Sequence, residues 1–83
     1  MNEVKSKIAK VICDLDSMNS QFVAKKSLLG QDIAIILQEF DGARSNEEQN
    51  FIESMHRALD LYSNTIAIVS SAKKQLEDVI SRL

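Results

Sequence analysis

The stretch FIESMHRALDLYSNTIAIVSSAKKQLEDVISRL, residues 51–83, decides the fold of this 83-residue chain. Apolar and small residues recur through it at alternating steps of four and three. Such spacing places them along one stripe of an α-helix. The members of the stripe are Phe51, Met55, Ala58, Tyr62, Thr65, Val69, Ala72, Leu76, Val79 and Leu83. We therefore predict one continuous helix over about residues 46–82.

The first half of the chain repeats the pattern with two interruptions, at Lys25 and Asp32. Its regular apolar positions are Val4, Ile8, Val11, Leu15, Met18, Phe22, Leu29 and Ile36. A straight helix drifts against a seven-residue repeat, so we expect the stripe to shift onto Ile33 beside Asp32. The spacing predicts a first helix over about residues 3–40.

A turn over residues 41–45 separates the two predicted helices. Asp41 and Gly42 can end the first helix, because glycine readily adopts the left-handed conformation after a helix end. Ser45 and Glu48 have the spacing of a capping box, which begins the second helix. Folding the chain back on itself makes facing residue numbers sum to about 87, and the two stripes then coincide. We predict an all-α fold, an antiparallel two-helix hairpin forming a single domain over residues 1–83.

Composition excludes several classes of function. One cysteine, Cys13, cannot form an internal disulfide, and one histidine, His56, cannot supply the ligands of a structural zinc site. We expect both residues to be exposed without a chemical role, and we predict no enzyme activity, metal or cofactor. A net charge of −2 disfavours nucleic acid as a partner. The apolar runs are far shorter than a membrane span, and the first residues do not resemble a signal peptide.

The sequence has more apolar residues than one stripe on each helix can hold. Contiguous apolar side chains left in water mark interaction sites. Two hairpins can bury such residues by packing together as a four-helix bundle. The predicted partner-binding residues are Ile52, Leu59, Leu61, Ile66, Ile68, Ile80, Leu28 and Ile35.

The triplet Phe40-Asp41-Gly42 lies between two predicted helices of nearly equal length. This arrangement resembles the WXG superfamily of small type VII secretion proteins, in which a Trp-X-Gly motif occupies the turn of a helical hairpin. Phenylalanine here replaces the tryptophan. The resemblance implies that Phe40 packs on the start of the second helix and that Gly42 forms the tight turn.

The chain departs from that family in lacking a Tyr-X-X-X-Asp/Glu secretion signal, since Tyr62 is followed four residues later by Ile66. The resemblance is therefore to the small partner proteins of LXG-type toxins in Gram-positive bacteria. It implies a targeting chaperone that binds the helical N-terminal domain of a toxin, or another small WXG-like protein. Such a protein resides in the cytoplasm, and export without a signal peptide is compatible with the sequence.

Two alternatives remain open at this point. One is a self-assembling structural protein, either a homodimer or a subunit of a secretion needle. The other is an export chaperone of a different system, such as a type III or flagellar chaperone. A needle subunit would polymerise through heterologous contacts as its concentration rises.

Overall fold

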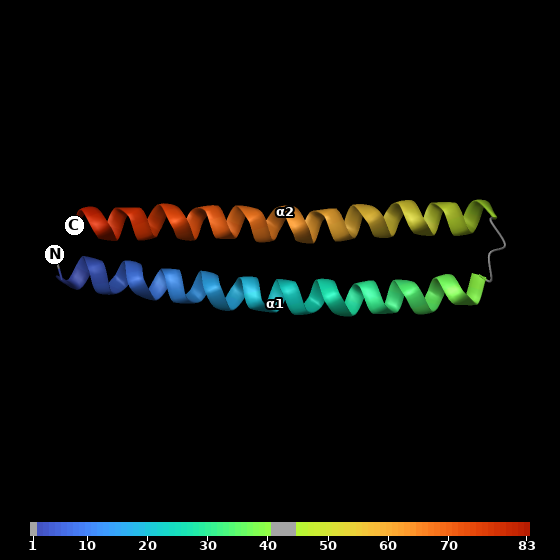
Figure 1. The fold of residues 1–83 in the computed structure, drawn as a ribbon, viewed down its shortest axis with the longest axis horizontal. Helices are drawn as coiled ribbons and strands as arrows, with labels where there is room; N and C mark the ends of the chain where they lie inside the picture. The colour runs from blue at the N-terminus through green and yellow to red at the C-terminus, as the bar shows by residue number, and fades with distance from the viewer. Residues whose placement is uncertain (1, 41–44) are drawn as a thin grey trace.

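The computed structural model describes residues 2–40 and 45–83, which form two helices. Helix α1 spans Asn2–Phe40 and helix α2 spans Asn46–Arg82. They lie side by side and antiparallel, with both termini at the same end of the molecule (Figure 1). The predicted all-α hairpin is thus confirmed. Asp41 and Gly42 lie outside the described residues.

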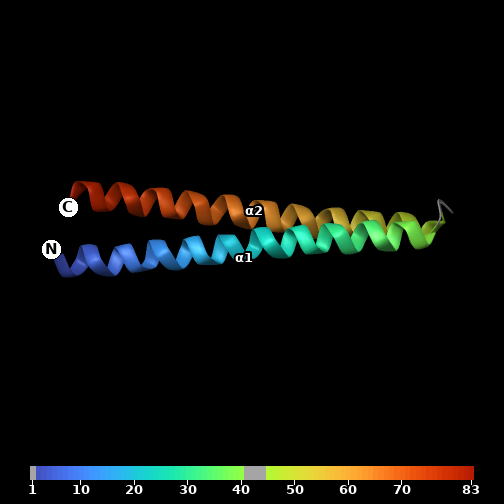
Figure 2. The same ribbon diagram turned by 60° about the horizontal axis from the view of Figure 1, so that its bottom comes forward.

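The hairpin is a long, thin rod. Its Cα atoms extend over 62 × 15 × 12 Å, and the two helix axes are slightly inclined to each other (Figures 1 and 2). A pair of helices can bury only the strip along which they touch. Within the described residues, the most deeply buried apolar side chains are those of Ile33 and Val69, which are 9% and 8% exposed. The core is accordingly one narrow strip between α1 and α2.

Local sequence signals set the beginning of α2. Ser45 has extended backbone angles, φ −73° and ψ 167°, and its hydroxyl oxygen accepts a hydrogen bond from the Glu48 amide at 3.2 Å. The Gln49 amide donates to the Ser45 carbonyl at 3.1 Å. Glu47 and Glu48 place negative charge at the positive end of the helix dipole. The predicted Ser45 cap is therefore present, and it satisfies amide groups that no preceding helical turn could serve.

Two aromatic contacts fix the register of the helices. The Phe22 and Tyr62 ring centroids lie 6.3 Å apart near the middle of the rod, and those of Phe40 and Phe51 lie 5.9 Å apart at the loop end. Both distances are typical of interacting aromatic pairs. The residue numbers of these pairs sum to 84 and 91, on either side of the predicted 87.

The predicted contact stripe of α1 was wrong at four of its eight positions. Val4, Val11, Met18 and Ile36 are each more than two-fifths exposed. The positions one residue later take their place in the contact: Ile12, Asn19, Lys26, Ile33 and Leu37 are buried or half-buried. The shift to Ile33 was expected beside Asp32, but it extends along the helix. Asn19 can occupy this strip because its amide finds partners on α2, and Lys26 can because its alkyl chain is apolar.

In α2 the predicted stripe agrees more closely with the structure. Val69 is buried, and the stripe from Phe51 to Leu76 is at least half-buried throughout. The exceptions are at its C-terminal end, where Val79 and Leu83 are 43% and 39% exposed. Ile80 is half-buried in place of Val79.

Candidate functional site

Polar contacts between the helices occupy one side of the hairpin. The Lys73 ammonium lies 2.7 Å from an Asp16 carboxylate oxygen. One turn further along α1, the Asn19 side-chain amide donates to the Ile66 carbonyl at 3.2 Å and to the Ser70 hydroxyl at 3.0 Å. We call this side, which carries Asp16, Asn19, Ser70 and Lys73, the bridged face.

The ion pair on the bridged face affects the titration of its lysine. The hydrogen bond to Asp16, reinforced by the charge of its carboxylate, raises the pKa of Lys73 above its ordinary value of 10.5. Lys73 therefore remains charged throughout the neutral range. The pair ties α1 to α2 while both side chains stay partly in solvent, so its contribution to stability is small.

Asn19 combines two satisfied donors with one unsatisfied acceptor. Its Oδ1 atom is buried and has no hydrogen-bond partner among the described residues. An unpaired buried acceptor costs about 1–3 kcal/mol. A polar residue within a helix–helix seam, however, favours the one register in which its donors are satisfied. Asn19 thus specifies the alignment of α1 with α2 at some expense in stability.

Around Leu61, the opposite side of the hairpin is apolar, and within residues 2–40 and 45–83 no salt bridge joins the two helices there. A hollow of about 260 Å³ lies there between the helices, lined by Phe22 of α1 and by Leu61, Tyr62 and Thr65 of α2. Met18 lies one turn before Phe22 and two residues after Asp16, a rotation of about 200° that places it away from the bridged face. We call this side, which carries Met18, Leu61, Thr65 and Ile68, the open face.

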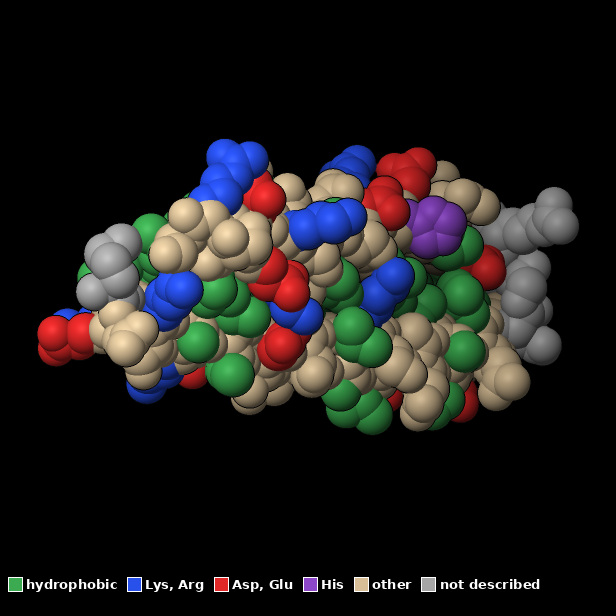
Figure 3. All heavy atoms as spheres, turned by 60° about the vertical axis from the view of Figure 1, so that its left-hand side comes forward, with side chains coloured by type: hydrophobic (Ala, Val, Ile, Leu, Met, Phe, Trp, Pro, Cys, Tyr) green, Lys and Arg blue, Asp and Glu red, His purple; other side chains and the backbone are tan. Residues whose placement is uncertain are grey.

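The structure divides the predicted partner-binding residues into two groups. Leu28, Ile35, Leu61 and Ile68 are exposed by 59%, 59%, 67% and 69% respectively. On α1, Leu28 and Ile35 lie about 80° and 100° around the helix from Met18, so they are exposed beyond the edge of the open face, on the side away from α2. The other group is half-buried along the contact between the helices and consists of Ile52, Leu59, Ile66 and Ile80. On the face of the molecule that Figure 3 shows, apolar side chains reach the surface between charged ones.

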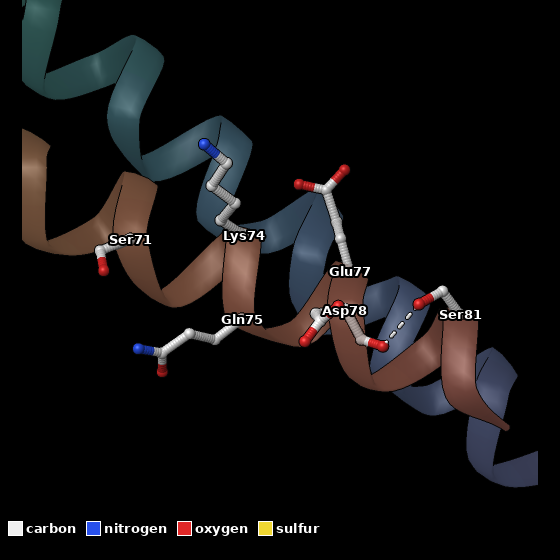
Figure 4. Close-up of a pocket in the computed structure, with 6 residues that line it drawn as sticks. All are labelled: Ser71, Lys74, Gln75, Glu77, Asp78 and Ser81. Carbon is white, nitrogen blue, oxygen red and sulfur yellow. Dashed lines mark hydrogen bonds between the residues drawn. The ribbon is translucent and has the colours of Figure 1, made fainter.

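A second hollow, of about 560 Å³, is polar and unsuited to binding. Its lining residues all belong to α2, and their side chains point in several directions from one helix (Figure 4). They are Ser71, Lys74, Gln75, Glu77, Asp78 and Ser81. The Ser81 hydroxyl already donates to the Asp78 carbonyl at 2.7 Å. A surface bounded by a single helix has no opposing wall, so it offers no enclosed space for a ligand.

The two candidate reactive residues both lie on the surface. Cys13 is a free, exposed cysteine, and His56 is exposed on α2. Among residues 2–40 and 45–83, no three His, Cys, Asp or Glu side chains come together as a group able to hold a metal ion. Neither α1 nor α2 combines the length and apolar character needed to cross a membrane.

Of the predicted turn motif, the structure describes Phe40 alone. Phe40 is the last residue of α1, and its ring contacts Phe51 in the second turn of α2. Phe40 thus packs on the start of α2. Asp41 and Gly42, outside the described residues, stay predictions.

Comparison with known proteins adds no relative. The chain matches no protein-family model, and searches of curated proteins and of solved structures found no significant match. The candidate site therefore depends on the hairpin's own geometry.

Proposed function

We propose that this chain is a non-enzymatic helical hairpin that binds a helical partner through its open face. The single observation that carries the proposal is the exposure of Leu61 and Ile68 in one helical row on that face; Leu28 and Ile35 form a second exposed row further around α1. Burying a leucine or isoleucine side chain stabilises a complex by about 1.5–3 kcal/mol. Partner helices laid along these rows would complete a four-helix bundle.

The resemblance to the WXG superfamily suggests the biological setting. We propose that the chain acts in type VII secretion in a Gram-positive bacterium, as a targeting chaperone. Its partner would be the helical N-terminal domain of an LXG-type toxin or another small WXG-like protein. The Phe40–Phe51 contact at the loop end supports this proposal, because the resemblance implies an aromatic residue that packs on the start of the second helix.

Co-expression tests the proposal directly. The chain is produced together with the helical N-terminal domain of a toxin encoded beside its gene, and the purified product is weighed by light scattering on a sizing column. We expect a stable complex containing both proteins. If the two proteins separate on the column, the proposed secretion role is refuted.

Matched substitutions test the surface. Leu61→Asp and Ile68→Asp should abolish the complex, because each puts a charge into the apolar contact. Ser71→Asp introduces the same charge at an exposed position of α2 outside the open face, and it should leave the complex intact. Equal loss with all three variants would show that another surface binds the partner.

A further inference from the structure

The apolar hollow on the open face has a size that suits one large side chain. Its volume is about 260 Å³, below the roughly 300–1,000 Å³ of sites that bind small molecules. Two of its lining residues are Phe22 and Tyr62, whose ring centroids lie 6.3 Å apart. Leu61, which also lines it, is exposed, so the hollow opens toward solvent. Pockets of this kind receive the apolar anchors that dominate binding at protein interfaces.

The open face is apolar on one side of this hollow and charged on the other. Toward the chain termini lie Met18 and Ile68, which are 42% and 69% exposed. Toward the loop, Lys25 lies three residues after Phe22, and Asp32 lies seven residues after Lys25. Both charged residues are exposed and stay within about 40° of Met18 around α1, so they continue the open face.

The charges of Lys25 and Asp32 have no counterpart in the hairpin. Neither residue forms an ion pair with any residue in the part of the chain that the structure describes. The residues three and four positions away from each of them are also uncharged. By contrast, the Lys10 ammonium lies 3.2 Å from an Asp14 carboxylate oxygen in the same helix. Lys25 and Asp32 are therefore available to a partner.

Helix α2 supplies no charge to neutralise them on this face. Its row on the open face runs past the hollow at steps of four and three and contains no charged residue. The row consists of Ser54, Ala58, Leu61, Thr65 and Ile68. Exposed charges beside an apolar pocket give specificity when a partner provides the opposite charges. The order of the two charges, positive near the hollow and negative one heptad beyond, gives this specificity a direction along the rod.

We infer that the partner helix on the open face carries three features in a fixed order. A large apolar side chain fills the hollow, a carboxylate one turn nearer the loop meets Lys25, and a basic residue two turns further on meets Asp32. A helix with the two charges exchanged meets like charges at both points, so it is rejected. This partner chemistry rests on the proposed function, which takes the open face as the docking surface.

A synthetic helical peptide provides the probe. Its single tryptophan is the anchor, a glutamate stands four residues from the tryptophan, and a lysine stands seven residues further on. The peptide is made in both chain directions, because a helix can run either way along the face. A matched peptide exchanges the glutamate and the lysine at constant composition. The chain itself has no tryptophan, so the emission of the peptide, which shifts to shorter wavelength in an apolar site, reports entry into the hollow.

Titration at low salt measures the dissociation constants. In one of the two directions, we expect the first peptide to bind about tenfold or more tightly than its charge-exchanged match. Lys25→Glu combined with Asp32→Lys exchanges the two charges of the chain at constant net charge, and it should reverse the preference between the peptides. Thr65→Met narrows the hollow, so it should weaken the preferred peptide about tenfold.

Controls separate partner chemistry from folding. Lys74→Glu reverses the charge of an exposed residue of α2 outside the open face, and it should leave the preference unchanged. Circular dichroism checks that every variant keeps its helices. Equal affinity for matched peptides, no emission shift with any peptide, or an unreversed preference in the double variant would overturn the partner chemistry. If the toxin domain still binds on co-expression, the proposed function survives that result. A clear peptide preference without a toxin complex has the reverse meaning.

Discussion

On the bridged face, the Lys73 ammonium and the Asp16 carboxylate lie 2.7 Å apart, and Asn19 donates two hydrogen bonds across to α2. On the open face, Leu61 and Ile68 keep about two-thirds of their surface in solvent. The polar groups of the first face are directed at the hairpin itself and align its helices. The apolar groups of the second face find little to contact within one chain. The difference indicates that the hairpin is complete on one side and unfinished on the other.

The largest expected effect on stability comes from placing a charge in the buried strip between α1 and α2. Val69→Asp places a carboxylate at a buried position, and it should destabilise the hairpin by about 3 kcal/mol or more. Thermal unfolding followed by circular dichroism measures the loss. Ile68→Asp, at the adjacent exposed position, should change the stability of the single hairpin by less than about 0.5 kcal/mol when measured at low concentration. Equal losses would remove the distinction between core and open face.

The aromatic contact at the loop end should have the next largest effect. Phe40→Ala removes a half-buried ring that touches Phe51, so we expect a loss of about 2 kcal/mol in the free energy of unfolding. Urea titration of Phe40→Ala, Phe51→Ala and the double variant measures the coupling of the rings. Strictly additive losses would show that the ring contact itself contributes nothing.

On the bridged face, the prediction concerns the unpaired oxygen of Asn19. Asn19→Leu removes the unpaired buried Oδ1 atom and adds apolar contact, so it should stabilise the hairpin by about 1 kcal/mol. It should also weaken the preference for one register, visible as broadened amide signals in NMR spectra. A destabilised variant would mean that the donated bonds to Ile66 and Ser70 outweigh the unpaired oxygen.

The smallest effect is expected from the exposed ion pair. The raised pKa of Lys73 means that the pair stabilises the folded hairpin at neutral pH, and that this stability is lost as the pH rises through the folded-state pKa, above 10.5. Asp16→Asn should abolish this part of the pH dependence with only a slight drop in melting temperature. Asp78→Asn, which breaks the Asp78–Arg82 pair within α2, should preserve it. If Asp16→Asn leaves the alkaline dependence intact, another group causes it.

Sequence patterns predicted the helices, their antiparallel arrangement and the Ser45 cap because each depends on residues close together in the chain. They did not predict which row of α1 faces α2. Val11 and Ile12 belong to rows one residue apart, and at heptad spacing each row has three apolar members, so the number of apolar residues could not decide between them. The choice depends on partners such as Ser70 and the Ile66 carbonyl, which only the paired helices reveal. For the same reason, exposed Leu61 could not be separated from half-buried Leu59 by spacing alone.

The rod-like shape of the hairpin makes its mode of assembly readable from X-ray scattering in solution. Its radius of gyration is 18.7 Å, whereas a globular chain of this length has about 12 Å. Two rods joined side by side become thicker but hardly longer. At equal mass concentration, forward scattering would double while the radius of gyration changed little. Rods joined end to end would instead lengthen with every added copy, so the slope of the scattering curve distinguishes a closed lateral pair from a growing fibre.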